Sequence, residues 1–395
     1  MRIGLSLAAL VNPGGIGRYT RLLARGLPSI FPEHTYIGYV ARFRESETLR
    51  VIESEGIVGW RIVVVPGGNR WAYEMQGLPS VLEKDPVDLF HGPDYLAPRV
   101  RSGHRHARLR RAESVPGTRV CVTVHDLAFR LHPSGMALKS RILFRMLAPG
   151  GIRRAAASGA VFCDSQATLD DLRKLGWLKA DEGRVVHLAC EDRFREKMPP
   201  DEVRKVLDKY GLPERYVLYV GPVELRKNVG VLVDAYRLVG RVLGRRGEAI
   251  PPLVAAGPLG AGGERLKRSL IAASDGLFSY LGYLDREELR ALYAGCTVFC
   301  YPSRYEGFGL PPLEAMSAGK AVVASNATSL PEVVGDAGLL VDPNDVQRWS
   351  EAILKCLTSE KLRVELEQAS HERSRMFSVE RMCREVMEGY LSVER

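Results

Sequence analysis

One stretch decides the fold: Tyr301-Pro-Ser-Arg-Tyr-Glu-Gly-Phe-Gly-Leu-Pro-Pro-Leu-Glu-Ala-Met316. The run that enters it, Thr297–Tyr301, is rich in β-branched and aromatic residues and predicts a buried strand. The pair Pro311 and Pro312 predicts the first turn of a short helix, where proline is tolerated because those N–H groups have no intrahelical partner. The stretch is therefore expected to be a turn that joins a buried strand to a helix.

The turn itself contains two glycines, Gly307 and Gly309. Glycine lets the backbone bend sharply and lets a ligand approach it closely. The amide groups of Phe308, Gly309 and Leu310 would face such a ligand at the positive end of the helix dipole. The turn is therefore a predicted binding loop.

Two carboxylates flank this loop: Glu306 stands in it, and Glu314 stands one to two turns into the helix, so both can face one crevice. The segment that they bound, E-G-F-G-L-P-P-L-E, resembles the E-x7-E signature of the retaining glycosyltransferases of family 4, which have the GT-B fold. The resemblance implies that Glu306 contacts the transferred sugar, that the amides of Gly307–Leu310 bind its hydroxyl groups, and that Glu314 binds the ribose of the nucleotide.

The composition predicts a globular chain of two or three domains, with 395 residues, 46% hydrophobic and 26% charged. The formal charge of +9 favours an anionic partner, which could be a nucleic acid, a nucleotide or a membrane surface. The seven cysteines have no CxxC or zinc-ligand spacing, which predicts buried free thiols in a reducing, cytoplasmic compartment. The apolar start, Met1–Val11, runs into a glycine-rich loop and predicts a first strand rather than a signal peptide. No run approaches the ~20 apolar residues of a membrane span.

Strand-like and helical patterns alternate along the chain, which predicts a parallel α/β architecture. The pattern restarts at Tyr216–Val220, after Pro199 and Pro200 in a charged stretch that predicts a linker. Two Rossmann-like halves facing a central cleft fit this better than one large sheet. The expected strands are Ile3–Ser6, Tyr36–Val40, Arg61–Val65, Leu89–His91, Val120–Val124, Ala160–Cys163 and Val185–Leu188, then Tyr216–Val220, Leu253–Ala256, Phe278–Leu281, Thr297–Tyr301, Ala321–Ser325 and Leu339–Val341.

The resemblance assigns a role to each half. Residues 1–198 are expected to form the acceptor-binding domain and residues 199–377 the nucleotide-sugar-binding domain. In GT-B enzymes the final helix crosses back onto the first domain, and residues 378–395 contain the candidate, Ser378–Leu391.

The first strand is followed by a glycine-rich loop, Asn12-Pro-Gly-Gly-Ile-Gly-Arg18. It is not GxGxxG, so it argues weakly for a nicotinamide dinucleotide. It resembles the G-G-I-G loop of family 4, which implies that Gly14 and Gly15 approach the donor pyrophosphate. From the loop alone, an ordinary strand-to-helix turn is equally compatible.

Two histidines, His91 and His125, each follow the carboxyl end of an expected strand, the edge where open α/β sheets bind ligands. A lone histidine there is more often structural. The V-H-D-L sequence around His125 resembles the family's H-D motif, whose histidine lies beside the donor sugar, so a functional role is favoured for His125. For His91 both roles stay open.

Between these histidines lies Arg99–Arg111, with six arginines and no acid. Family members usually connect these strands more briefly, so the segment looks like an insertion. A solvated loop and a patch for anionic lipid headgroups, or for the pyrophosphate of a lipid-linked acceptor, remain equal alternatives.

The second half opens on Val220-Gly-Pro-Val-Glu-Leu-Arg-Lys-Asn228, which resembles the V-G-x-x-x-x-R-K-N form of the family's donor-phosphate motif. Many relatives carry arginine where this chain has Pro222. The resemblance implies that Arg226 and Lys227 supply the charge for the pyrophosphate, whose leaving group gains negative charge in the transition state. A merely exposed basic helix start is disfavoured, because cations oppose the helix dipole there.

These motifs together predict a metal-independent, retaining glycosyltransferase that moves a hexose from a nucleotide-diphosphate sugar to a glycan or lipid-linked acceptor. No cofactor and no metal ligand are expected, and peripheral membrane contact would run through Arg99–Arg111. The resemblance is to bacterial enzymes that often use mannose, glucose or rhamnose donors. The predicted catalytic residues are His125, Glu306, Lys227 and Arg226, and the predicted donor-binding residues are Gly14, Gly15, Gly307, Phe308, Gly309, Leu310 and Glu314.

Two other functions remain compatible with parts of this pattern. A nucleotide-sugar epimerase or a phosphorylase of the GT-B fold would share the architecture. A basic nucleic-acid-binding protein would match the charge, but the chain has no interleaved aromatic platform or nucleic-acid motif. We therefore expect no nucleic-acid partner.

Overall fold

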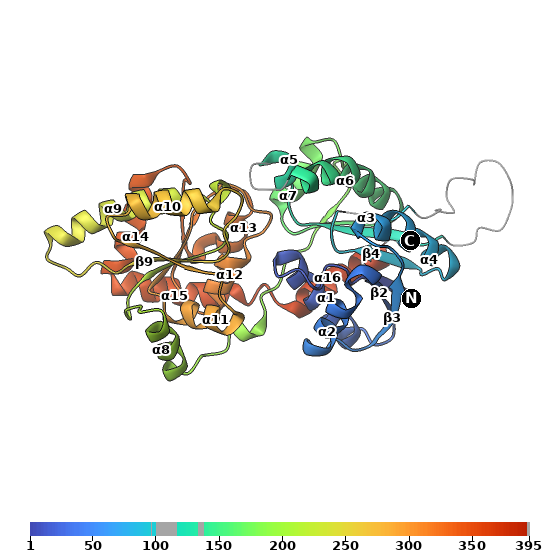
Figure 1. Cartoon of the computed structure of the whole chain (residues 1–395), viewed down its shortest axis with the longest axis horizontal. Coiled ribbons are helices and arrows are strands. Elements are labelled where there is room, and N and C mark those ends of the chain that lie inside the picture. Colours follow the sequence, from blue (N-terminus) through green and yellow to red (C-terminus); the bar gives the residue numbers. More distant parts are fainter. Residues whose placement is uncertain (96, 100–116, 133–137, 393–395) are drawn as a thin grey trace. The chain divides into compact units, whose positions relative to one another are not determined.

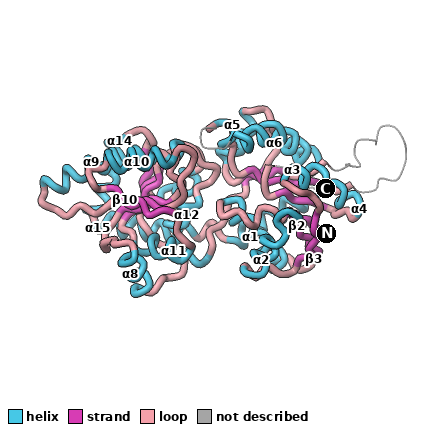
Figure 2. Tube along the Cα trace, in the orientation of Figure 1, coloured by secondary structure: helices cyan, strands magenta, loops and turns pink. Residues whose placement is uncertain are grey.

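The computed structural model describes residues 1–95, 97–99, 117–132 and 138–392, and it divides into two compact units (Figures 1 and 2). Unit 1 comprises Met1–Leu127, Ile142–Ala189 and Val379–Arg395, and unit 2 comprises Ala128–Arg141 and Cys190–Ser378. In each unit the strands lie inside a layer of helices, as Figure 2 shows.

Unit 1 is built on a seven-stranded parallel sheet in the order β3-β2-β1-β4-β5-β6-β7. Strand β1 pairs with β2 on one side and with β4 on the other, so the strand order changes direction between β1 and β4. Open parallel sheets bind ligands at such a switch point, beyond the carboxyl ends of the strands. The strands are β1 (Arg2–Ser6), β2 (Thr35–Ala41), β3 (Trp60–Val65), β4 (Leu89–Gly92), β5 (Arg119–Val124), β6 (Val161–Cys163) and β7 (Arg184–Val185).

The C-terminal helix of the chain belongs to unit 1, where it packs against α1 (Figure 1). Its packing depends on close approach at glycines: a Cβ on Gly26 would lie 2.5 Å from Cys383 Sγ, and one on Gly389 would lie 2.3 Å from the Phe162 ring. The prediction that the final helix returns to the first half is confirmed. The helices are α1 (Gly15–Ile30), α2 (Glu45–Ser54), α3 (Arg70–Ala72), α4 (Leu78–Lys84), α6 (Leu138–Ser158), α7 (Gln166–Lys174) and α16 (Val379–Ser392), with a π-helical turn η2 (Tyr73–Gly77) between α3 and α4.

Unit 2 is built on a six-stranded parallel sheet in the order β10-β9-β8-β11-β12-β13. Its four central strands, β9, β8, β11 and β12, are short and fully buried, as expected of a parallel sheet covered on both faces. The change of direction here falls between β8 and β11, which pair with each other. The strands are β8 (Val217–Val220), β9 (Leu253–Ala256), β10 (Phe278–Gly282), β11 (Val298–Tyr301), β12 (Val322–Ser325) and β13 (Leu339–Val341).

The helices of unit 2 carry the apolar stripes that cover this sheet, and the fully buried Trp349 lies in the first turn of α14. The short helix predicted after Gly309 is present and begins with Leu310, Pro311 and Pro312. The helices are α5 (Ala128–Leu131), α8 (Pro200–Lys209), α9 (Val229–Arg245), α10 (Gly263–Ala273), α11 (Arg286–Gly295), α12 (Leu310–Ser317), α13 (Leu330–Val334), α14 (Val346–Thr358) and α15 (Glu360–Ser374).

The predicted strands are all present, with ends that differ by a few residues at most. The largest difference is at β7, where the predicted Val185–Leu188 is a two-residue strand, Arg184–Val185, at the edge of its sheet. The expectation of a linker at Pro199 and Pro200 is wrong, because Pro200 begins α8, in the helical position where proline is tolerated.

The seven cysteines are all buried and free of disulfides, as predicted. Among the residues that the structure describes, no helix combines the length and apolar character that a membrane crossing requires.

Candidate active site

A buried ion pair lies beyond the carboxyl ends of β8 and β11, the two strands at the switch point of unit 2. Lys227 ends the turn η6 (Leu225–Lys227) that follows β8, and Glu306 follows β11. Lys227 Nζ donates to Glu306 Oε1 over 2.5 Å and to the hydroxyl of Tyr301 over 3.0 Å. Tyr301 in turn donates to the same carboxylate oxygen over 3.0 Å. The sheet order therefore joins two residues that are 79 positions apart in the sequence.

Arg226 extends this pair into a network. Its guanidinium donates to Glu224 Oε1 over 2.8 Å and to the carbonyl of Tyr305 over 2.7 Å, and it lies 3.5 Å from Glu306 Oε2. Its side chain is only 14% exposed. The structure thus brings the predicted residues Arg226, Lys227 and Glu306 together, and it adds Glu224 as the group that orients Arg226.

The charges of this network decide the state of its carboxylate. Burial alone would raise the pKa of Glu306, but the charges of Lys227 and Arg226 outweigh it and hold that pKa below its ordinary value. Glu306 is therefore ionised at neutral pH. A buried cation that loses this partner is left uncompensated, which costs far more than a surface pair.

The loop after Glu306 has a backbone that only glycine adopts easily. Gly309 has φ = 120°, and a Cβ there would lie 2.7 Å from Leu330 Cδ2. The hydroxyl of Ser329 donates to the carbonyls of Glu306 (3.1 Å) and Phe308 (2.6 Å), which fixes the loop from the next strand connection. The N–H of Leu310, the first residue of α12, follows at once; Pro311 and Pro312 after it have no N–H, and an N–H in the first turn of a helix has no intrahelical partner.

Thr328 also holds this loop, and its own backbone is strained. It has φ = 51°, which is rare for a β-branched residue, and its Oγ1 accepts from the N–H of Glu306 over 3.0 Å. Backbone strain of this kind persists where surrounding contacts enforce it, and it concentrates at functional sites. Thr328 therefore marks Glu306 as a residue whose position is closely controlled.

Glu314 lies in α12 and is 2% exposed. Its Oε2 accepts a hydrogen bond of 2.8 Å from the hydroxyl of Tyr293 in α11. The contact orients the carboxylate that the resemblance assigns to the ribose. That assignment remains a prediction.

The predicted donor-binding glycines Gly14 and Gly15 lie in unit 1, at the start of α1. The N–H of Gly14 donates to the side chain of Asn12 over 2.8 Å, and the buried Arg21 donates to the carbonyl of Leu10 over 2.5 Å. These hydrogen bonds hold the loop between β1 and α1 in a defined conformation.

His125 also lies in unit 1, just beyond β5, and it is 8% exposed. Its Nδ1 lies 2.7 Å from Asp164 Oδ2, and its Nε2 lies 2.9 Å from the carbonyl oxygen of Pro93. Because that carbonyl can only accept, Nε2 carries a proton. Burial lowers the pKa of His125, but the charge and hydrogen bond of Asp164 outweigh it and raise the pKa above its ordinary value.

His91 has a structural environment. It is fully buried, its Nδ1 lies 2.6 Å from the hydroxyl of Tyr390 in α16, and its Nε2 lies 2.8 Å from Thr123 Oγ1. Burial lowers the pKa of His91 to about 3, so the ring is neutral. The histidine joins the C-terminal helix to the sheet of unit 1. The other basic candidate, the segment Arg99–Arg111, lies outside the described residues except for Arg99.

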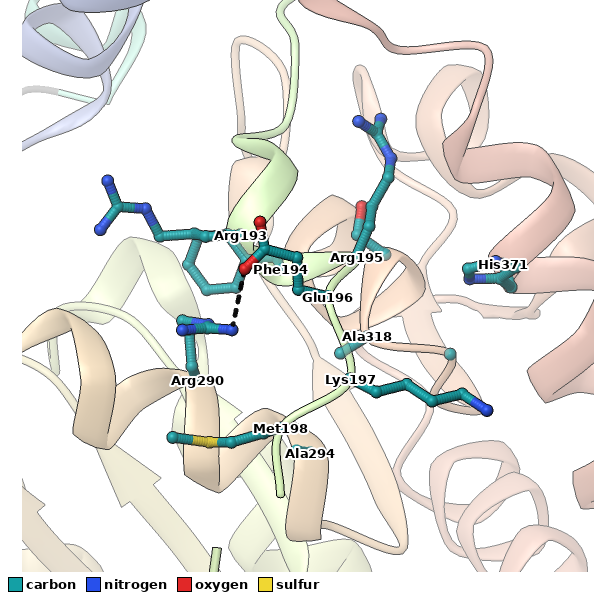
Figure 3. A pocket seen from close by; sticks show the side chains of 12 residues that line it. Arg193, Phe194, Arg195, Glu196, Lys197, Met198, Arg290, Ala294, Ala318 and His371 are labelled. Atoms are coloured by element: carbon teal, nitrogen blue, oxygen red, sulfur yellow. Dashed lines mark ion pairs between the residues drawn. The ribbon is translucent and has the colours of Figure 1, made fainter. Parts of the chain in front are cut away.

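A cavity of about 550 Å³ in unit 2 is not part of this network (Figure 3). Its one ion pair between lining residues joins Arg290 to Glu196, 3.6 Å apart, and no predicted site residue lines it. It touches the site only indirectly, because the Phe194 ring packs edge-on against Tyr293, 5.7 Å between centroids. The cavity is lined by Arg193, Phe194, Arg195, Glu196, Lys197, Met198, Arg290, Ala294, Ser317, Ala318, Gly319 and His371.

Sequence reasoning missed several members of the network. Tyr301 and Glu224 lie inside the two motifs, but nothing in their spacing indicated that Tyr301 would bond to Glu306 or that Glu224 would bind Arg226. Thr328 and Ser329 come from the connection after β12, and no local signal in the sequence links them to Glu306.

Comparisons with known proteins agree with this geometry. The family model for glycosyl transferases group 1 matches residues 202–373, and the model for a glycosyl transferase 4-like domain matches residues 14–189. The O-antigen chain mannosyltransferase B of Escherichia coli is 34% identical over 308 residues, covering 76% of this chain and 74% of that protein. The serotype-specific mannosyltransferase WbdA of Escherichia coli is 33% identical over 289 residues, covering 71% of this chain; the chain spans about a third (34%) of that longer protein.

Solved structures show the same fold. HepE of Anabaena, in complex with UDP and glucose, has a TM-score of 0.71 at 17% identity, covering 99% of this chain and all (100%) of that one. Sucrose-phosphate synthase of Thermosynechococcus elongatus has a TM-score of 0.71 at 18% identity, covering 100% of this chain and 99% of that one. The fold is therefore GT-B, and the chain belongs to the group 1 glycosyl transferases, the glycosyltransferases of family 4.

Proposed function

We propose that this glycosyltransferase moves a mannosyl unit from a nucleoside-diphosphate sugar to a glycan or lipid-linked acceptor, with retention of configuration and without a metal ion. The observation that carries the proposal is the buried network of Lys227, Arg226 and Glu306 beside the glycine loop. Two cations and one carboxylate suit a ligand that combines a diphosphate with sugar hydroxyl groups. The relatives that are named mannosyltransferases favour mannose as the transferred sugar, and the similar structure with bound UDP and glucose supports a nucleotide-sugar donor.

The proposed mechanism is transfer on one face of the sugar. The acceptor oxygen forms a bond to the anomeric carbon as the bond from that carbon to the diphosphate breaks, and the acceptor proton passes to the departing phosphate oxygen. Lys227 and Arg226 would stabilise the negative charge that grows on the diphosphate, while Glu306 would hold the sugar. When the donor binds, the side chain of Lys227 would move from Glu306 to the phosphate. The free protein would thus already hold the cation and the carboxylate close to the positions that the donor needs.

The remaining predicted residues complete this proposal. Gly307, Phe308, Gly309 and Leu310 would place their amides on the sugar and phosphate, and Glu314 would bind the ribose. Gly14 and Gly15 would approach the pyrophosphate from unit 1, and His125 would lie beside the donor sugar.

Metal independence rests on charge compensation by side chains. Among the described residues, no group of three histidine, cysteine, aspartate or glutamate side chains is placed to hold a metal ion. Arg226 and Lys227 would supply the positive charge instead. We place the enzyme in the cytoplasm, where thiols stay reduced, because its seven cysteines are buried and free. For lipid-linked acceptors we propose peripheral membrane contact through Arg99–Arg111.

The test is a thermal-shift screen with GDP-mannose, UDP-glucose and dTDP-rhamnose, followed by transfer assays with the donor that binds. A donor at a hundred times its dissociation constant adds about 2.7 kcal/mol to the free energy of unfolding. NMR of the product then reports the anomeric configuration. A product with inverted configuration, or epimerisation of the donor without transfer, would overturn the proposal.

A further inference from the structure

The hydroxyl of Tyr301 lies between the two partners of the buried ion pair in unit 2. It accepts a hydrogen bond of 3.0 Å from Lys227 Nζ and donates one of 3.0 Å to Glu306 Oε1. Lys227 Nζ also reaches that carboxylate oxygen directly, over 2.5 Å. The three groups therefore form a closed triangle, in which Glu306 Oε1 receives one hydrogen bond from a cation and one from a neutral hydroxyl.

The ring that carries this hydroxyl is fixed by the sheet. Tyr301 is the last residue of β11, and its side chain is buried. Its ring stacks on Phe299 of the same strand, 6.1 Å between centroids, and on Tyr219 of the neighbouring strand β8, 5.9 Å between centroids, with an interplanar angle of 17° in both contacts. Groups carried by strands are held more precisely than groups carried by loops. The hydroxyl of Tyr301 is therefore a fixed point beside two residues that stand in loops or turns.

The direction of both hydrogen bonds follows from the protonation of the three groups. Burial and the charge of Glu306 raise the pKa of Tyr301 well above its ordinary value, so the hydroxyl keeps its proton. An ammonium group has donors and no acceptor, whereas an ionised carboxylate has acceptors and no donor. The hydroxyl must therefore accept from Lys227 and donate to Glu306.

The proposed reaction separates the charged pair that Tyr301 joins. When the donor binds, Lys227 moves from Glu306 to the diphosphate, and the carboxylate loses its shortest hydrogen bond. Tyr301 still donates to Glu306 Oε1 at that point, and Arg226 lies 3.5 Å from the other oxygen. A buried carboxylate that lost its donors would be costly and free to turn away from the sugar. The fixed hydroxyl opposes both effects.

We propose that Tyr301 is a positioning residue, whose hydroxyl holds the Glu306 carboxylate toward the transferred sugar while Lys227 moves to the diphosphate. Tyr301 acts through Glu306 and bonds to neither the sugar nor the diphosphate. A small misplacement of a group that stabilises the transition state lowers the rate of transfer more than it weakens donor binding. This inference rests on the proposed function, because it gives Tyr301 a task in the same transfer step.

The first test removes the hydroxyl and keeps the stacked ring. With GDP-mannose as donor and methyl α-D-mannopyranoside as acceptor, Tyr301→Phe should lower kcat by about tenfold and leave donor KM within about twofold of the parent. The matched control is Tyr216→Phe. Tyr216 is also fully buried and lies next to β8, but its hydroxyl donates to the carbonyl of Leu292 over 2.6 Å. Its variant loses a buried hydrogen bond in the same unit and should keep kcat within about twofold of the parent.

A double-mutant cycle shows whether the hydroxyl acts through Glu306. In the Glu306→Ala background, Tyr301→Phe should lower kcat by less than about twofold, because the carboxylate that it positions is already gone. A tyrosine with a merely structural role would lower kcat by the same factor in both backgrounds. Calorimetric titration with GDP reports separately whether the site is intact, and the affinity of Tyr301→Phe for GDP should stay within about twofold of the parent.

The outcomes separate this inference from the proposed function. Unchanged kcat in Tyr301→Phe overturns the positioning role, and so does an equal loss of kcat in the parent and Glu306→Ala backgrounds. A Tyr301→Phe variant that unfolds, or that no longer binds GDP, also overturns it, because the hydroxyl would then hold the site together rather than position one carboxylate. Failure of the parent protein to transfer sugar from any nucleotide sugar would instead refute the proposed function.

Discussion

Glu306 and Glu74 are both buried glutamates beyond the carboxyl ends of parallel strands, yet their surroundings drive them to opposite states. Glu306 lies against Lys227 and Arg226, which overcome burial and keep its pKa low. Glu74 has Asp94 beside it as well as Arg70, so burial prevails and its pKa rises to about 8. The difference shows that neighbouring cations can outweigh burial and keep a buried acid ionised, whereas burial prevails where an acid and a cation beside it oppose each other.

The largest expected effect comes from removing the cation beside Glu306. Lys227→Ala should lower kcat by about a hundredfold, as loss of one donor to a charge that develops in the transition state costs ~3 kcal/mol. Arg226→Ala should also be strongly impaired if it replaces the arginine absent at Pro222. Steady-state kinetics with the identified donor measure both variants. The matched control is Lys209→Ala, which removes a Lys–Glu pair from the surface of the same unit. An Arg226→Ala enzyme with unaltered kcat and KM would show that Arg226 takes no part.

A smaller effect should separate the two acids of the E-x7-E segment. Glu306→Ala should lower transfer by about tenfold or more, a transition-state loss of ~1.4 kcal/mol or above, and leave nucleoside diphosphate binding nearly intact. Glu314→Ala should mainly weaken nucleoside diphosphate binding. Calorimetric titration with GDP and UDP, beside transfer rates, measures the two effects. Equal losses of diphosphate affinity in both variants would contradict this division of roles.

The pH dependence of stability should distinguish Glu74 from Glu306 directly. The pKa of Glu74 rises from 4.5 to about 8 in the folded state. The folded state therefore binds more protons in that window, and its free energy of unfolding falls as pH rises. Glu74→Gln should remove this loss. The free energy of unfolding of the variant should therefore rise relative to that of the parent by up to ~1.4 kcal/mol for each pH unit between these values. Thermal unfolding from pH 4 to pH 9 measures it.

Glu306→Gln is the contrasting variant in the same experiment. The pKa of Glu306 is depressed, so its stabilisation is complete above the unfolded value and is lost as pH falls through the folded one. Its difference from the parent should therefore change only at acid pH. A Glu74→Gln variant whose advantage does not grow between pH 5 and pH 8 would show that Glu74 is ionised like Glu306.

The smallest expected effect is none. Transfer should persist in excess EDTA, because we propose that Arg226 and Lys227, which lie together beside Glu306, take over the charge compensation that a metal ion would otherwise provide. Rates with and without EDTA, and with added Mg²⁺ or Mn²⁺, measure this. Complete loss in EDTA that Mn²⁺ restores would refute the metal-free mechanism.

The fold was largely predictable, because its signals are local. Apolar runs such as Leu253–Ala256 mark buried strands by composition alone, and Gly309 with Pro311 marks the start of α12. The site was predictable only as far as its motifs reach. Lys227 and Glu306 stood in separate motifs, and their contact follows from the adjacency of β8 and β11, which no local pattern encodes.

The residues that were missed depend on tertiary contacts. Thr328 reaches the N–H of Glu306 from another strand connection, and its positive φ is imposed by its surroundings rather than by its own propensity. Glu74 gave no signal in the sequence, because an acid in a helical pattern is normally solvated. Its burial and its raised pKa become visible only once the packing of Tyr73 and the position of Asp94 are known.

The position of α16 has a consequence for how the protein is made. Tyr390 bonds to His91, and Gly389 leaves room for the ring of Phe162, so the last helix completes a core whose strands come from the first half of the chain. A chain that emerges from the ribosome in order has finished all of unit 2 before α16 appears. Domains generally fold as units during synthesis, the N-terminal one first. Here the core of the first domain must wait for α16, so unit 1 can be completed only after all of unit 2 has been synthesised.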